Sequence, residues 1–220
     1  MLGETLRPSS RPLVESERRL LRAKIRDLES RAGRGAHVVG VGVLVIAILW
    51  ALTLMASEAT WPWITLFWIL AGGLILLWAR RDMGRDLAHL SEMARAFESA
   101  LRRNEAEVFH IKAKSFVEIE ELEDEGACYA FDIDEGRIVF VVGQEFYPEA
   151  KFPSHDFSLV YILDERGNPV HMVIDKRGPR ASPAQVVPRN LKLQVEIPEH
   201  LEIINGSLGQ LEEILGRRSS

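Results

Sequence analysis

The sequence contains one cysteine and no excess of positive charge, and each of these features argues against a class of protein. Cys128 is the single cysteine in 220 residues, which excludes an internal disulfide and a cysteine-rich zinc site. A chain that needs no disulfide fits a reducing compartment. The formal net charge of -5 argues against a protein that binds nucleic acid through an overall basic surface. We expect Cys128 to be a small buried residue and not a nucleophile.

Charged side chains are also absent from two long apolar runs. Residues 36–56 and 61–79 contain no Asp, Glu, Lys or Arg, and each run is close to the roughly 20 residues that a membrane-crossing helix needs. Tryptophans near the ends of both runs match the aromatic belt of a bilayer interface. The sequence therefore predicts a transmembrane hairpin with a tight turn over Ser57–Thr60, and the lipid bilayer as a partner. Because neither run contains Asp, Glu, Lys or Arg, we expect an anchor and not a transport path.

The basic residues predict the orientation of this hairpin. Residues 1–35 contain nine Lys and Arg, the turn contains none, and Arg80 and Arg81 follow the second run. By the positive-inside rule, we expect both termini and the region after the second run to be cytoplasmic. A cleaved signal peptide, with Ser57 and Ala59 at the spacing of a cleavage site, is the alternative. The long leader and the second apolar run argue against it.

Heptad-like apolar rows flank the two runs. One row covers residues 83–101 in steps of four and three, and a similar row covers residues 14–32. Together with the hairpin they predict a helical region over 13–107, whose stalk is either intramolecular or shared between subunits of a homo-oligomer. Two amphipathic helices lying on the bilayer are the alternative. Residues 1–12 contain two prolines and are expected to be a flexible tail.

After residue 107 the pattern changes from a helical period to a strand period. Short segments rich in β-branched and aromatic residues alternate with turn residues such as Asp134-Glu135-Gly136. The predicted strands cover residues 116–122, 128–133, 137–142, 157–163, 169–174 and 191–197, with a further edge strand over 108–113. They predict an antiparallel β domain over 108–205, either a barrel or a sandwich, and a short C-terminal helix in 206–220. The predicted fold class is therefore an α+β membrane protein.

One stretch carries a resemblance to known proteins. The sequence FVEIEELEDEGACYAFDIDEGRIVFVVGQEFYP, residues 116–148, is similar to a recurring module. With the helical hairpin before it, the chain resembles small uncharacterised bacterial inner-membrane proteins that have an N-terminal transmembrane hairpin and a cytoplasmic β domain. Bacterial proteins with a pleckstrin-like β domain after paired spans share this architecture by analogy of fold. The resemblance implies an anchored β domain and no particular activity.

Carboxylates are concentrated in one short run of the β domain. The run contains Glu118, Glu120, Glu121, Glu123, Asp124 and Glu125. A solvated acidic face accounts for it, and the spacing lacks the pattern of a known calcium loop, so we predict no metal site. A docking surface for a basic partner, where charge favours orientation and rapid association, is the intermediate interpretation.

Groups suited to catalysis are few. Ser154-His155-Asp156 has the residue types of a triad, but neighbours in an extended segment point in alternating directions and do not converge. The six histidines show no paired spacing of metal ligands. We therefore predict no catalytic residues and no cofactor. A small enzyme that uses Asp156, His155 or Glu145 as acid or base is a rival interpretation.

The segment 142–153 interrupts the strands with aromatic, proline and polar residues. Its aromatic side chains either contact a partner or fold back onto the core, and we predict the former. The predicted partner-binding residues are Phe146, Tyr147, Phe152, Glu118, Glu120, Glu123, Asp124 and Glu125. The predicted function is a membrane-anchored scaffold whose cytoplasmic β domain recruits a protein partner. A sensor of lipid or of a small ligand is the alternative.

Overall fold

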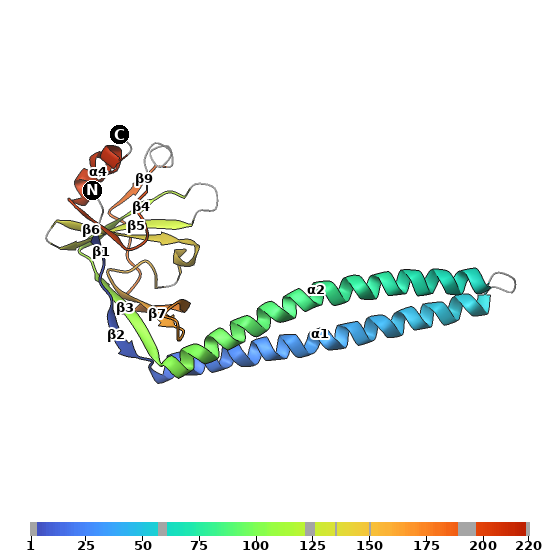
Figure 1. Cartoon of the computed structure of the whole chain (residues 1–220). Helices are drawn as coiled ribbons and strands as arrows, with labels where there is room; N and C mark the ends of the chain where they lie inside the picture. The colour runs from blue at the N-terminus through green and yellow to red at the C-terminus, as the bar shows by residue number, and fades with distance from the viewer. Residues whose placement is uncertain are drawn as a thin grey trace. The chain divides into compact units, whose positions relative to one another are not determined.

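A computed structural model gives the fold of the chain (Figure 1). It describes residues 4–56, 61–121, 126–134, 136–149, 151–188 and 197–218. The chain divides into two compact units. The helical unit comprises residues 13–104 and 163–170, and the β unit comprises residues 1–12, 105–162 and 171–220.

Two long helices make up most of the helical unit. α1 covers Glu15–Ala56, α2 covers Trp61–Arg103, and the two lie side by side as an antiparallel hairpin (Figure 1). Leu21, Leu28 and Phe97 are buried, and they belong to the two apolar rows of the sequence. These rows therefore face inward in the part of the hairpin that was predicted to be a stalk.

Hydrogen bonds from side chains fix the beginning of α1 and the end of α2. The carboxylate of Glu17 accepts the backbone N–H of Val14 at 2.9 Å, as in a capping box. α2 ends at Asn104, whose φ of 56° is the left-handed conformation that commonly terminates a helix. The guanidinium of Arg18 donates to the side-chain oxygen of Asn104 at 2.9 Å. The two helix ends are thus joined by one polar contact.

The structure contradicts the prediction that the apolar runs span a membrane. Within the described residues, no helix has a stretch that is both long and apolar enough for a crossing. The transmembrane hairpin over 36–56 and 61–79, the membrane fold class and the inner-membrane localisation are therefore wrong. The predicted turn Ser57–Thr60 lies outside the described residues.

Two sheets form the β unit. The first has the spatial order β1 (Glu4–Thr5), β10 (Glu202–Asn205), β6 (Arg137–Gly143), β5 (Ala127–Asp134), β4 (Ser115–Ile119) and β9 (Gln185–Val187). The second has the order β2 (Ser9–Pro12), β3 (Glu105–Lys112), β7 (Asp156–Leu163) and β8 (Pro169–Lys176). β9 pairs with β4 in parallel, so the unit is not the purely antiparallel domain that was predicted.

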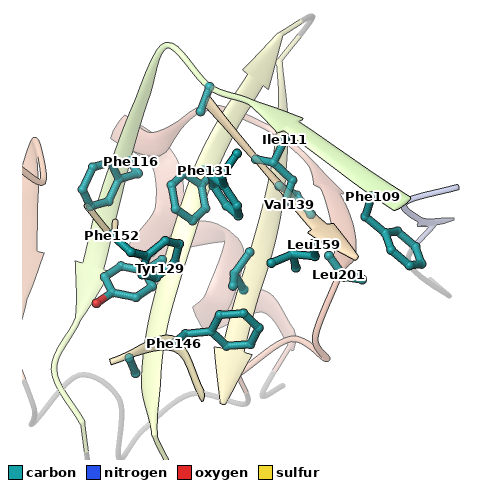
Figure 2. Packing of buried hydrophobic residues seen from close by; sticks show 14 of the residues in the cluster. Phe109, Ile111, Phe116, Tyr129, Phe131, Val139, Phe146, Phe152, Leu159 and Leu201 are labelled. Carbon is teal, nitrogen blue, oxygen red and sulfur yellow. The ribbon is translucent and has the colours of Figure 1, made fainter. Parts of the chain in front are cut away.

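One aromatic core joins the inner faces of both sheets. Phe109 and Ile111 of β3 pack in the same cluster as Phe116 of β4 and as Tyr129 and Phe131 of β5 (Figure 2). The contribution of both sheets to one core makes the unit a sandwich, which the sequence had left open against a barrel. The alternation of side chains along a strand explains why Phe109 and Ile111 face this core while His110 between them is exposed.

A second apolar cluster covers the outer face of the larger sheet. Cys128, Ala130 and Phe140 point to this face, where Leu211 and Leu215 of the terminal helix α4 (Leu211–Arg218) pack against them. β5 is therefore buried on both faces, which explains its nearly continuous apolar sequence. The prediction that Cys128 is a buried core residue is confirmed, since its exposed fraction is 0%.

The prediction of a flexible tail is wrong for residues 4–12. Glu4 and Thr5 pair with Ile203 and Glu202, and residues 9–12 pair with β3. These strands escaped prediction because they are short and polar, and because their partners lie far away in the sequence. Of the predicted strand 191–197, all but Ile197 lies outside the described residues, as does Glu135 of the predicted hairpin turn.

Candidate functional site

An exposed tyrosine beside a carboxylate marks one candidate site. The hydroxyl of Tyr147 donates to Oε1 of Glu121 at 2.5 Å, and the same oxygen accepts the backbone N–H of Gly126 at 2.9 Å. Tyr147 follows the 3-10 turn η1 (Gln144–Phe146) and its exposed fraction is 42%. The ring is therefore held in a fixed orientation while one side of it stays open to a partner.

The backbone around this pair is tightly packed. Gly126 has a φ of +93°, and a Cβ at this position would lie 2.3 Å from the carbonyl carbon of Gly143. Only glycine fits such a close approach between the beginning of β5 and the end of β6. The packing sets Glu121 and Tyr147 against each other, since they lie on the segments that meet there.

The remaining acidic residues have different environments. Glu118 lies on β4 opposite Tyr129 of β5, with its side chain partly buried. Glu120 is exposed just beyond the end of β4, and its N–H donates to the carbonyl of Val187 at 3.0 Å. Glu123, Asp124 and Glu125 lie outside the described residues. No group of three metal-ligating side chains occurs in the described ranges.

Two of the predicted contact residues are in the core. Phe146 and Phe152 have exposed fractions of 0%, so the prediction that they bind a partner is wrong. Phe152 packs edge-on against Tyr129 and Phe157 at centroid distances of 5.6 and 5.3 Å. Figure 2 shows both phenylalanines among the core side chains. A segment of irregular backbone has thus folded its two phenylalanines inward and left Tyr147 outside.

Phe146 is held inward by a polar pair that the sequence did not reveal. The ring of His200 stacks on Phe146 with centroids 5.0 Å apart. The N–H of Val142 donates to Nδ1 of His200 at 3.1 Å, and a hydrogen bond of 2.7 Å joins Nε2 to the hydroxyl of Tyr161. Because Nδ1 accepts, the neutral ring carries its proton on Nε2 and donates it to Tyr161. Phe146, Tyr161 and His200 come from three separate segments, so the sequence alone does not indicate that they meet.

Both members of this pair are held neutral. Burial lowers the pKa of His200, and the nearby carboxylate of Glu145 opposes that effect. Burial, followed by the charge of Glu145, raises the pKa of Tyr161 to about 12. His200 is therefore a structural histidine at neutral pH, and Glu145 influences it from an exposed position.

A shallow cavity of about 430 Å³ lies elsewhere in the β unit. It is lined by His155, Asp156, Gly178, Pro179, Arg180, Ala181 and Ser182. The loop over residues 177–181 is tied to its opposite wall by two hydrogen bonds, from Arg177 N to the carbonyl of Asp156 (3.1 Å) and from Ala181 N to the carbonyl of Pro153 (2.9 Å). The structure thus brings together His155 and Asp156 of the rival enzyme interpretation. Tyr161 is five residues from Asp156 along β7, which is roughly 16 Å. Glu145 lies near Tyr161 and is therefore not part of this cavity.

A serine, a histidine and an aspartate do lie close together, but they are Ser158, His110 and Asp156 and not the consecutive residues 154–156. Ser154 is buried and exchanges hydrogen bonds with the backbone of Asp156, so it makes no contact with the ring of His155 that chemistry would need. Instead, Nδ1 of His110 lies 3.1 Å from the hydroxyl of Ser158, and its Nε2 lies 3.8 Å from Oδ1 of Asp156. Ser158 is only 1% exposed, which closes this hydroxyl to a substrate.

Two buried polar atoms near the loop over residues 177–181 have no hydrogen-bond partner. They are Oδ1 of Asp156 and the hydroxyl of Tyr129. Burial, then the charge of Glu118, raises the pKa of Tyr129, while the charge of Arg180 opposes this. A buried polar atom without a hydrogen-bond partner costs roughly 1–3 kcal/mol of stability.

No protein-family model, curated protein or solved structure matches this chain. The function is therefore argued from the geometry alone.

Proposed function

We propose that the β unit is a binding module that recruits a protein partner through a surface centred on Tyr147 and Glu121. The observation that carries this proposal is the hydrogen bond that fixes an exposed tyrosine ring against a carboxylate. Tyrosine is enriched among residues that dominate binding energies, and a fixed ring loses little entropy when a partner docks.

The charge of the surface favours a basic partner. Glu121 places a carboxylate beside the ring of Tyr147, Glu120 is the neighbouring exposed carboxylate in the sequence, and the chain as a whole has a net charge of -5. An arginine or lysine side chain of the partner would lie over the tyrosine ring and contact these carboxylates. The preferred partner is thus a segment rich in Arg or Lys.

Binding of a fluorescent peptide of alternating arginine and glycine tests this proposal, with a glutamate–glycine peptide of equal length as reference. Tyr147→Ala should weaken binding of the basic peptide about tenfold or more. Glu121→Gln keeps an acceptor for Gly126 N but removes the charge, and it should also weaken binding. Glu212→Gln, which removes one exposed charge from α4, is the matched control.

The salt dependence and the control decide the outcome. Binding by wild type should weaken as salt increases, because exposed charges are screened. If Glu121→Gln and Glu212→Gln weaken peptide binding equally, the interaction is non-specific attraction between charges, and the proposal is overturned. Binding that survives Tyr147→Ala unchanged would do the same.

A small-ligand site is a second candidate function, favoured by Asp156 and Arg180, which line the same cavity with side chains of opposite charge. Arg180 on the same wall makes no ion pair within the described part of the chain. We propose a small zwitterion as its ligand, with an amino group at Asp156 and an anionic group at Arg180. A volume of about 430 Å³ lies at the lower end of the range for ligand sites.

Amide chemical-shift changes on titration with β-alanine test this second candidate, with propionate and propylamine as probes that each carry one charge. Changes should be confined to the cavity loop and should be larger for β-alanine than for either single-charge probe. Arg180→Gln and Asp156→Asn should abolish them, whereas Arg166→Gln, an exposed arginine in the β7–β8 turn, should not. Equal responses to all three probes would reject the candidate.

A further inference from the structure

The edges of the two sheets differ greatly in length. β1, β9 and β2 are edge strands of two, three and four residues, and β2 ends in Pro12. β8 is also an edge strand, but it is eight residues long. Natural sheets usually protect their edges by keeping them short or by placing Pro and Lys on them. β8 has Pro169 and Lys176 only at its two ends, so residues 170–175 contain neither of these protecting residue types.

We propose that β8 pairs with β8 of a second copy of this chain, antiparallel and centred on Val173. Two four-stranded sheets would then form one continuous sheet across a twofold axis. The sequence of the strand, PVHMVIDK, decides in favour of a second copy because it is self-complementary in this register.

Complementarity of the facing side chains selects the register. Pairing Val173 with Val173 of the second copy places His171 opposite Asp175 and Met172 opposite Ile174. A twofold axis at Met172 would place Asp175 opposite a proline, and one at Ile174 would place His171 opposite Arg177. Opposite charges directly across an antiparallel pair stabilise it, and like charges destabilise it. The register centred on Val173 therefore places an imidazole opposite a carboxylate and Met172 opposite Ile174, whereas the two neighbouring registers have no such His–Asp pair.

The two faces of β8 agree with this pairing. Met172 and Ile174 pack against the aromatic core, so His171, Val173 and Asp175 lie on the opposite face by strand alternation. Asp175 is exposed and is 3.6 Å from Arg177. An exposed ion pair of this kind contributes little, so a second copy displaces it at small cost. Residues 170–174 are all only partly buried in one chain, which leaves surface for a second copy to cover.

Cysteine crosslinking in the full-length chain tests the register. In a pair centred on Val173, the two Val173 Cα atoms are about 5.5 Å apart, within the span of a disulfide. Val173→Cys should therefore form a disulfide-linked dimer on mild oxidation. His171→Cys alone should not, since its two copies are roughly 13 Å apart, but a mixture of His171→Cys and Asp175→Cys chains should crosslink. Native Cys128 is buried and does not interfere.

Charge exchange tests the same register without crosslinking. Sedimentation equilibrium should show that His171→Asp weakens the dimer about tenfold, because two pairs of carboxylates then face each other. Adding Asp175→Lys to this variant should restore the dimer. Val173→Pro should remove it, because proline cannot donate its backbone N–H at the axis. Gln185→Pro on the short edge β9 is the matched control and should leave the dimer unchanged.

Three results would overturn the proposal. One is a wild-type chain that is monomeric at every concentration. Another is His171→Cys crosslinking alone as well as Val173→Cys does. The third is a dimer that survives both Val173→Pro and His171→Asp, which would assign association to other surfaces, such as the exposed Leu52, Leu74 and Trp78 of the helical hairpin.

Discussion

The imidazole of His200 stacks on the ring of Phe146 with centroids 5.0 Å apart, at an interplanar angle of 21°. This contact decides which aromatic residues of the 142–153 segment are available for binding. It holds Phe146 in the core, and Tyr147, the next residue, is left at the surface with its hydroxyl on Glu121. Neighbouring aromatic residues therefore have opposite roles.

Truncating these two neighbours should separate the roles. Phe146→Ala should lower the free energy of unfolding by about 3–5 kcal/mol, because it removes a fully buried ring. Tyr147→Ala should lower it by less than about 1 kcal/mol, since the ring is 42% exposed. Urea unfolding of both variants measures this difference. Equal losses would show that Tyr147 is a core residue and would remove the basis of the docking surface.

Stability should fall as the pH falls below the ordinary pKa of a histidine, about 6.5. Burial lowers the pKa of His200 in the folded chain, so the unfolded chain binds a proton first as the pH decreases. The stabilisation from the neutral ring is complete above the unfolded pKa and is lost progressively below it. Melting temperatures measured between neutral and mildly acidic pH show this loss in wild type. His200→Gln should reduce the slope, whereas His155→Gln, an exposed histidine, should not.

Tyr161→Phe should destabilise the chain although it deletes a single oxygen atom. The substitution leaves the Nε2 proton of His200 without its acceptor, and a buried unpaired donor costs about 1–3 kcal/mol. Thermal unfolding at neutral pH measures the effect. Tyr147→Phe, which removes an exposed hydroxyl, provides the comparison and should cost less. A larger loss in Tyr147→Phe would contradict the assignment of Tyr161 as the structural partner.

Gly126→Ala should cost at least about 2 kcal/mol, since its Cβ would lie 2.3 Å from backbone carbon and its φ of +93° is strained for any side chain. Because Gly126 N–H donates to Glu121, the same variant should also weaken binding of the basic peptide. Gly209→Ala, where nothing lies within 4 Å, should change stability by less than about 0.5 kcal/mol. Chemical unfolding of the pair checks the prediction, and indistinguishable stabilities would refute it.

The sequence predicted those elements that have a strong local pattern. β5, β6, β7 and β8 lie within two residues of their predicted bounds, because β-branched and aromatic runs with clear turns specify strands locally. β1, β2, β9 and β10 were missed because they are short and acquire their structure only from distant partners. The membrane prediction rested on the absence of charge from two runs, and within the described residues no helix is both long and apolar enough to cross a membrane.

The candidate site likewise contains residues that the sequence identified locally and residues whose role depends on distant segments. The exposed Tyr147 and the acidic run were visible in the sequence, since residue type alone suggests a surface role. The inward turn of Phe146 was not, because it depends on His200 and Tyr161, which come from other segments. The approach of His110 to Ser158 likewise depends on the register of β3 against β7 and has no local signature.

The pairing of β1 with β10 has a consequence for the order in which the protein matures. Glu4 and Ile203 are partners, so β1 is synthesised long before the strand with which it pairs. Pairing between such distant segments forms slowly, because the intervening chain loses entropy when its ends are joined. The early strands β1 and β2 are therefore unpaired on the ribosome while the helical hairpin is already complete. Synthesis rate and chaperone supply should affect the yield of the β unit more than that of the helices.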